Sequence, residues 1–335
     1  MRSPLSFLAL TSLLLPASAL AQSPSAEPIT VTASPITDFQ RAAIGEQVDG
    51  LIFKGGLQLS SSHPDFGGIS GLAFLDADRF VMVTDEGRFI SGALALAEGA
   101  PAGVADVEID VIRNSKGAPL PRKFAQDSEA VEAIFREDGT SAVRVGFEHL
   151  ARIADFEMIA GRPGGAAREV AIPDWLTALR TNESIESVCI APPASPVAGS
   201  TLIITEAHSL VPGTWAATLL GNRDRGDLHL AQGGGVNPTD CAFLPNGDLL
   251  VLERGFAFLT FTARLRLIPA DEVQPGATME GEVIFSASGG EIDNFEALGV
   301  RGLPDGETRI TMVSDDNFNS FQRTLLLDFA LPDPE

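Results

Sequence analysis

The stretch Asn294–Asn317, NFEALGVRGLPDGETRITMVSDDN, decides the fold because four other segments of the chain share its plan. In each, a small polar or acidic residue opens a short apolar run, a turn follows, and a second apolar run ends in acid. The other four are GISGLAFLDADRFVMVTDEG (68–87), DSEAVEAIFREDGTSAVRVGFEH (127–149), ESIESVCIAPPASPVAGSTLIITEAH (183–208) and PTDCAFLPNGDLLVLERG (238–255). Two apolar runs joined by a turn predict a β-hairpin, so the chain contains five equivalent hairpins.

The hairpins recur at a nearly constant spacing. The residues that open them are 59, 57, 54 and 56 residues apart, and they are Ser70, Glu129, Glu186, Asp240 and Glu296. A period of about 55 residues is typical of a propeller blade of four strands, and it is too long for most helical or leucine-rich repeats. Two further β-rich segments follow each of the first four hairpins, whereas only RTLLLDFAL (323–331) follows the fifth.

We therefore predict an all-β propeller of five four-stranded blades. The outer strand that the fifth blade lacks is expected from GLIFKGGLQLS (50–60), which would close the ring. A sixth blade is the alternative if PITVTAS (28–34) and a loop build another sheet. The predicted organisation is a signal peptide at 1–21, an N-terminal lead-in at 22–47 and one propeller domain at 48–335.

The charge and the N-terminal segment restrict the partners and the compartment. Acidic residues outnumber basic ones by 45 to 23, which gives a formal net charge of −22 and disfavours binding to nucleic acid or anionic membranes. The apolar run 5–15 followed by Ala19-Leu20-Ala21 is typical of a cleaved secretory signal. No later stretch reaches the ~20 apolar residues of a membrane span. We expect a monomeric protein that is periplasmic or secreted.

The only two cysteines, Cys189 and Cys241, lie at equivalent places in two neighbouring repeats. Export would permit a disulfide between them. The alternative is two buried thiols that act as small apolar side chains. The sequence leaves both possibilities open.

Propeller geometry predicts that the acids of the five hairpins meet. The innermost strand of a blade crosses the disc and the next strand returns, so the start of the first and the end of the second share one face. Carboxylates gathered there raise one another's pKa or require a cation, and clusters of oxygen ligands suit calcium. The expected calcium ligands are Glu129, Glu148, Glu186, Glu206, Asp240, Glu253, Glu296, Asp315 and Asp316.

Basic side chains follow several of these acids, namely Arg88, His149, His208 and Arg254. A rim of mixed charge could hold a metal and an oxyanion together. For each single acid the alternative is a structural role, because a carboxylate at a strand end also caps backbone amides or pairs with an arginine of the next blade.

Several motifs resemble the phytase-like propeller family of exported bacterial proteins, which is described as having esterase-like activity. The motifs are GGISGLAF, DSEAVEAI, NESIESVCIAP, LLVLERGF, DNFEAL and VSDDNFNSFQRTLLLDFAL. The resemblance spans 66–331 and implies a calcium-associated acidic face and a hydrolase of ester or phosphate-ester bonds. By position it points to Glu129, Glu186, Glu253, Arg254, Glu296, Asp315, Asp316 and Asn317.

The leading prediction is calcium-assisted hydrolysis of a small anionic or ester substrate at this mouth. The candidate catalytic residues are Glu186, His208, Arg254 and Glu296, and the candidate substrate-binding residues are Arg88, His149 and Asn317. A serine hydrolase is disfavoured because the chain has no G-x-S-x-G, and the lack of tyrosine excludes a sialidase nucleophile. The alternatives are a lactonase-like hydrolase and a non-catalytic, calcium-stabilised propeller that binds a partner or an envelope ligand.

Overall fold

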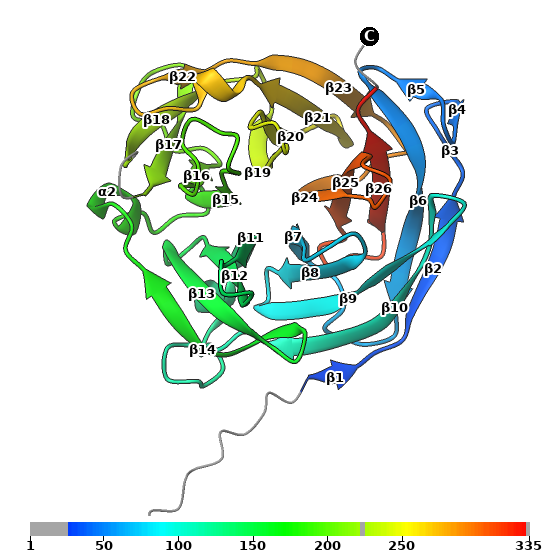
Figure 1. Ribbon diagram of the computed structural model, residues 1–335, viewed down its shortest axis with the longest axis horizontal. Coiled ribbons are helices and arrows are strands. Elements are labelled where there is room, and N and C mark those ends of the chain that lie inside the picture. The colour runs from blue at the N-terminus through cyan, green and yellow to red at the C-terminus, as the bar shows by residue number, and fades with distance from the viewer. Residues whose placement is uncertain (1–25, 222–224, 333–335) are drawn as a thin grey trace, which may run out of the picture.

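The computed structural model describes residues 26–221 and 225–332, in which five β-sheets are arranged radially around a central axis (Figure 1). The predicted signal peptide at 1–21 lies outside the described residues. Short helical segments lie in connections between strands, at α1 (Lys123–Gln126), α2 (Asp174–Thr177) and η1 (Ala270–Glu272). No described helix has the length and apolar character needed to cross a membrane.

The first two blades each contain four antiparallel strands, which follow one another in chain order from the axis outward. Blade 1 is built from β7 (Ile69–Phe74), β8 (Arg79–Thr84), β9 (Arg88–Ala97) and β10 (Ala100–Val111), with β1 (Glu27–Pro28) outside them. Blade 2 is built from β11 (Ser128–Phe135), β12 (Ser141–Phe147), β13 (Arg152–Ile159) and β14 (Arg162–Val170).

The third and fourth blades repeat this order. Blade 3 is built from β15 (Ile185–Ile190), β16 (Thr201–Thr205), β17 (Thr214–Leu220), β18 (Gly226–Ala231) and β22 (Thr278–Met279). Blade 4 is built from β19 (Asn237–Phe243), β20 (Leu249–Ala257), β21 (Thr260–Ile268) and β23 (Glu282–Ser288).

The fifth blade joins the two ends of the chain and closes the ring. It is built from β24 (Asn294–Gly302), β25 (Thr308–Asp315), β26 (Thr324–Ala330), β6 (Leu51–Ser61) and β2 (Val31–Ile36), in that order. The N-terminal β6 pairs with the C-terminal β26, with Leu57 opposite Leu326, so the predicted closure is confirmed. The segment considered for a sixth blade supplies β1 and β2 instead, and β2 extends the edge of blade 5.

Short strands at the N-terminal end complete the fold. β5 (Gln47–Val48) pairs with β6, and β3 (Asp38–Phe39) forms a two-stranded sheet with β4 (Ala42–Ala43). Tight turns join the two inner strands of a blade on the face away from the predicted site. Gly247 and Gly306 take φ angles of 98° and 93° there, which glycine adopts without a Cβ clash.

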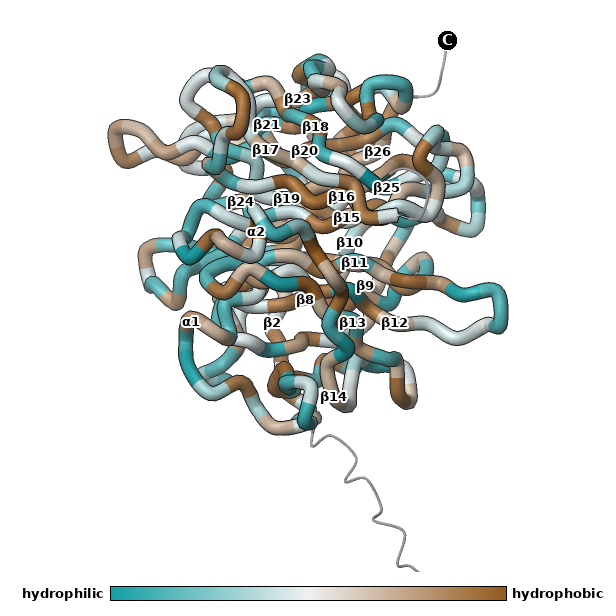
Figure 2. The backbone as a smooth tube through the Cα atoms, turned by 90° about the vertical axis from the view of Figure 1, so that its left-hand side faces the viewer, coloured by the Kyte–Doolittle hydropathy of each residue, from teal (hydrophilic) through white to brown (hydrophobic). Residues whose placement is uncertain are grey.

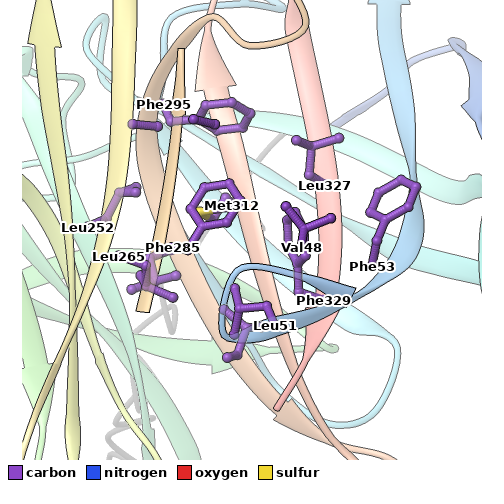
Figure 3. Close-up of a cluster of buried hydrophobic side chains, with 14 of the residues drawn as sticks. Val48, Leu51, Phe53, Leu252, Leu265, Phe285, Phe295, Met312, Leu327 and Phe329 are labelled. Atoms are coloured by element: carbon purple, nitrogen blue, oxygen red, sulfur yellow. The ribbon is translucent and has the colours of Figure 1, made fainter. Parts of the chain in front are cut away.

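The hydrophobic core lies between neighbouring blades. In the layer between blades 4 and 5, Phe53, Phe285, Phe295 and Phe329 are fully buried and pack with leucines from both blades (Figure 3). Burying one such side chain contributes roughly 2 to 3 kcal/mol. Seen from the side, apolar stretches lie within the stacked strands (Figure 2). The packed layers hold the inner strands in fixed positions around the axis.

A disulfide joins Cys189 on β15 to Cys241 on β19, with 5.9 Å between the two Cα atoms. Of the two possibilities that the sequence left open, the structure therefore contains the bonded pair. The link connects the inner strands of blades 3 and 4 and closes a loop of 52 residues. A loop of that length stabilises the fold by about 4 kcal/mol on the chain-entropy argument.

Candidate functional site

Every inner strand carries a β-bulge near its start. At this point one residue of the inner strand has no partner on the second strand, so a side chain is re-aimed. The five bulge residues are Ser70, Glu129, Glu186, Thr239 and Glu296. The three glutamates, in blades 2, 3 and 5, line one pocket at the mouth of the central channel.

The end of each second strand contributes a further residue at an equivalent place. These five residues are Asp85, Glu148, Glu206, Arg254 and Asp315, and all of them line the same pocket. In the strand register, Arg254 lies opposite Asn237 and Asp315 lies opposite Asn294. The backbone N–H groups of Asp85, Glu148 and Glu206 donate to carbonyl oxygens directly before the inner strands of blades 1 to 3. Four blades thus place an acid here, and blade 4 places an arginine.

The structure corrects the predicted alignment of blade 4 by one residue. Thr239 and Arg254 occupy the positions that the sequence pattern gave to Asp240 and Glu253, and a shift of one residue turns a strand side chain to the other face. Asp240 is buried and accepts hydrogen bonds from the backbone N–H groups of Cys241 and Leu298, at 2.8 and 2.7 Å. Glu253 is buried in an ion pair with Arg266.

The hydroxyl groups at the remaining two bulges bond the next blade. Ser70 Oγ donates to the carbonyl oxygen of Ser128 at 2.5 Å, and Thr239 Oγ1 donates to that of Phe295 at 3.3 Å. In both cases the acceptor directly precedes a bulge glutamate of the neighbouring blade. Blades 1 and 4 therefore anchor the glutamates beside them.

The pocket has a volume of about 720 Å³ and is strongly acidic. Lys123 and Arg254 are the basic residues that line it within 26–221 and 225–332. Its eight carboxylates are Asp85, Asp127, Glu129, Glu148, Glu186, Glu206, Glu296 and Asp315. Its other lining residues are Asn182, Asn294, Asn317, Asn319, Gln322, Phe256 and Phe261.

Burial and the charges of neighbouring acids raise the pKa values of seven of these carboxyl groups. Burial, followed by the charge of Glu296, raises the pKa of Asp315 to about 9. Burial also raises the pKa values of Asp85 and Glu148 to about 7. The pKa values of Glu129 and Glu186 lie well above the usual range, because both are buried and surrounded by other acids. A cation in the pocket would favour the ionised forms.

Three buried oxygen atoms of the pocket lack a donor among the described residues: Asp85 Oδ1, Glu148 Oε1 and Asn294 Oδ1. Carboxylate oxygens of Glu148, Glu186 and Glu206 lie within 4.8 Å of one another. A second group within the same limit consists of Asp127, Glu148 and His149. Calcium takes six to eight oxygen ligands in flexible geometry, so this donor set fits calcium.

Arg254 lies between two of the acids. Its Nη2 atom is 3.5 Å from Glu206 Oε1 and 3.4 Å from Glu296 Oε1. Burial alone would lower the pKa of Arg254, but the charges of Glu296, Glu186 and Glu206 raise it. The guanidinium group therefore remains positive at the edge of the acidic cluster.

The structure brings most of the predicted site residues together and separates five of them from the pocket. Those that line it are Glu129, Glu148, Glu186, Glu206, Arg254, Glu296, Asp315 and Asn317, while His149 lies beside it on Asp127 and Glu148. Besides Asp240 and Glu253, the residues that neither line the pocket nor contact its acids in this way are Arg88, His208 and Asp316.

Each of these three residues has another neighbour. Arg88 pairs with Asp65 at 2.9 Å in a separate, smaller pocket. His208 stacks on Trp175, with 5.6 Å between the ring centroids. Asp316 accepts hydrogen bonds from the N–H of Gly68 and from Thr324 Oγ1, so it fixes the loop that follows β25.

The predicted site residues did not include Asp127, and the repeat pattern placed Asp85 beside Ser70 at the mouth without assigning it a role. Asp85 follows β8 as Glu148 follows β12, and Asp127 opens the quoted hairpin of blade 2. A strand-by-strand alignment of the repeats would have assigned both residues to the pocket. Phe256 and Phe261 carry no such signal, because aromatic residues at a hairpin end are equally typical of packing.

Comparison with known proteins places the chain in a family. The family model named Phytase-like, with the description "Esterase-like activity of phytase", matches residues 64–318. No curated protein sequence matches this chain.

Solved propeller structures are similar only at a distance. The Dos1 propeller shares 10% identity with a TM-score of 0.35, over 85% of this chain and 75% of that one. The structure "YCF48 bound to D1 peptide" shares 10% identity with a TM-score of 0.35, and the match covers 96% of this chain and 98% of that one. YCF48 from Cyanidioschyzon merolae shares 13% identity with a TM-score of 0.35, and the match covers 83% of this chain and 78% of that one. None of these likenesses bears on activity.

Proposed function

Because the chain belongs to the phytase-like family, we propose that it is a metal-dependent hydrolase of ester or phosphate-ester bonds that acts at the acidic mouth. The observation that carries this proposal is the convergence of eight carboxylates on one pocket lined by two basic residues of the described chain. An acid with a purely structural role would have a cation or several N–H donors beside it. The excess negative charge favours a pocket built to hold a cation.

Calcium is the proposed cofactor, and Glu148, Glu186 and Glu206 are its proposed ligands. Their oxygens are close enough to share one ion, and the unsatisfied Glu148 Oε1 is available to it. When bound, a divalent ion supplies positive charge that polarises a phosphoryl or carbonyl oxygen and lowers the pKa of water.

The neighbouring residues supply the remaining chemistry. Arg254 is positive and faces the pocket, so it would orient an anionic oxygen of the substrate and stabilise the charge that develops on it. Glu296 lies beside Arg254, and one of its oxygens accepts a hydrogen bond from Asn294 Nδ2 at 2.7 Å. We assign Glu296 the role of the base that takes a proton from the attacking water. Asn317 would donate to the substrate.

We propose export as well. The disulfide between Cys189 and Cys241 supports this, because disulfides persist in oxidising compartments such as the periplasm and the exterior of the cell.

Hydrolysis of a small substrate panel tests the function. The panel consists of p-nitrophenyl phosphate, p-nitrophenyl acetate, phytate and a lactone, each measured with calcium and with a chelator. We expect calcium-dependent turnover, and a loss of at least about 100-fold in kcat/KM for Glu296→Gln, since removal of a general base costs 10² to 10⁴. Glu137→Gln, an exposed acid at the far turn of blade 2, is the matched control.

Three results would overturn all or part of this proposal. Turnover that survives both chelation and Glu296→Gln would place the chemistry elsewhere. A melting temperature raised by calcium without turnover of any substrate would favour the non-catalytic binding propeller. Selective turnover of the lactone would favour the lactonase-like alternative.

A further inference from the structure

Two phenylalanine side chains interrupt the polar lining of the pocket. Phe256 at the end of β20 and Phe261 at the start of β21 are the aromatic residues that line it within the described chain. Phe256 is 56% exposed. An exposed aromatic ring beside eight carboxylates contributes little to folding, and exposed apolar surface with a polar rim is typical of a ligand-binding site.

The two rings pack against each other and form one aromatic platform. Phe256 and Phe261 are registered directly opposite each other on the β20–β21 ladder, and their ring centroids are 4.8 Å apart. Phe261 also packs against the buried cluster between blades 4 and 5. The core therefore holds Phe261, and Phe261 holds Phe256, so little side-chain freedom remains to be lost when a ligand binds.

The platform adjoins the proposed anion site. Arg254 and Phe256 are two residues apart on β20, so their side chains lie on the same face of the strand, about 7 Å apart along it. Arg254 reaches inward to Glu206 and Glu296, whereas the ring of Phe256 lies further out. A substrate with its anionic group at Arg254 would extend its next atoms over the two rings.

We propose that Phe256 and Phe261 select esters of apolar alcohols, that is, a phosphate or similar anionic head on an alkyl or aryl group. The inference rests on the proposed hydrolase function and names its substrate class. A compact polyanion would gain nothing from the aromatic platform and would meet repulsion from the carboxylates around it. A single anionic head with an apolar tail matches both the charged and the apolar parts of the pocket.

Binding of alkylphosphonates tests the platform without requiring turnover. Methylphosphonate and hexylphosphonate are titrated into the protein in calcium buffer and followed by calorimetry, while hydrolysis of methyl and hexyl phosphate is measured in parallel. We expect hexylphosphonate to bind at least about tenfold more tightly, since covering a few methylene groups contributes that much. Phe256→Ser should reduce this ratio to about two.

Phe258→Ser is the matched control. Phe258 lies at the tip of the same hairpin, is fully exposed and lies outside the pocket lining. The control should keep the full ratio, and Phe256→Leu should restore most of it. Equal binding of the two phosphonates, or an equal loss of the ratio in Phe256→Ser and Phe258→Ser, would overturn the platform. If methyl phosphate is hydrolysed under those conditions, the hydrolase itself still stands, whereas no binding and no hydrolysis would reject both proposals.

Discussion

The buried acids within the blades and the acids of the mouth differ in how many basic side chains lie beside them. Within the blades, each of three buried acids has arginine beside it. Asp155 contacts Arg144 and Arg168 at 2.7 and 2.8 Å, and Asp328 contacts Arg301 and Arg309 at 2.9 and 2.7 Å; the third acid, Glu253, pairs with Arg266. At the mouth, eight carboxylates line one pocket, and Lys123 and Arg254 are the basic residues of the described chain that line it with them. Buried acids with a structural role thus have arginine beside them or, like Asp240, backbone N–H donors, whereas the acids of the mouth outnumber the basic residues beside them.

The difference follows from strand register. In blade 2, Arg144 and Arg168 are the registered neighbours of Asp155 on the strands to either side. At the mouth, the residue at the end of the second strand, beside the start of the inner strand, is an acid in four of the five blades. Position within the repeat therefore decides whether a carboxylate receives a partner.

The largest expected contrast is in stability. Asp328→Asn should lower the free energy of unfolding by about 3 to 5 kcal/mol, because it leaves Arg301 buried without an anion and Arg309 with Glu307 alone. Glu186→Gln, the matched isosteric change at the mouth, should be neutral or stabilising in calcium-free buffer, since it removes a source of repulsion. Urea denaturation of both variants measures the contrast. Equal destabilisation would show that the mouth carboxylates have structural partners too.

Calcium should produce the next effect. At a concentration of 100 times its dissociation constant, the ion should stabilise the protein by about 2.7 kcal/mol, and chelation should reverse this. Thermal unfolding with and without calcium measures the shift. Glu148→Gln should abolish it, because this residue belongs to both groups of converging ligands. Glu137→Gln should retain it; a shift that persists in Glu148→Gln would move the ion to another site.

The stability of the calcium-free protein should also depend on pH. In calcium-free buffer, raised pKa values of Asp85, Glu148 and Asp315 mean that the folded protein binds more protons than the unfolded chain between about pH 4 and pH 9. Stability from these groups is therefore complete below pH 4 and is lost as the pH rises through 7 and 9. Melting temperatures at pH 5 and pH 9 check the sign. A higher value at pH 9 would contradict the acidic cluster.

The repeat pattern predicted the fold well, because blade number, ring closure and the shared face of the acids depend on spacing and strand direction. It failed in blade 4, where Thr239-Asp240 and Glu253-Arg254 each offer an acid next to the true position. An acid one residue away from the bulge looks equivalent in sequence but faces the opposite side of the strand. The bulge register and the position of Phe256 at the mouth are set by tertiary packing, which no local pattern reports.

The most direct test is calorimetric titration of calcium into the calcium-free protein at pH 7 in buffers of different ionisation enthalpy. We expect saturable binding that releases protons, since Glu148, with a pKa of about 7, and Glu186, with a pKa well above the usual range, must ionise to hold the ion. The measured heat should then vary with the buffer, and Glu186→Gln should weaken the binding. No binding, or binding that is the same in Glu186→Gln, would contradict the claim that the mouth carboxylates form a metal site.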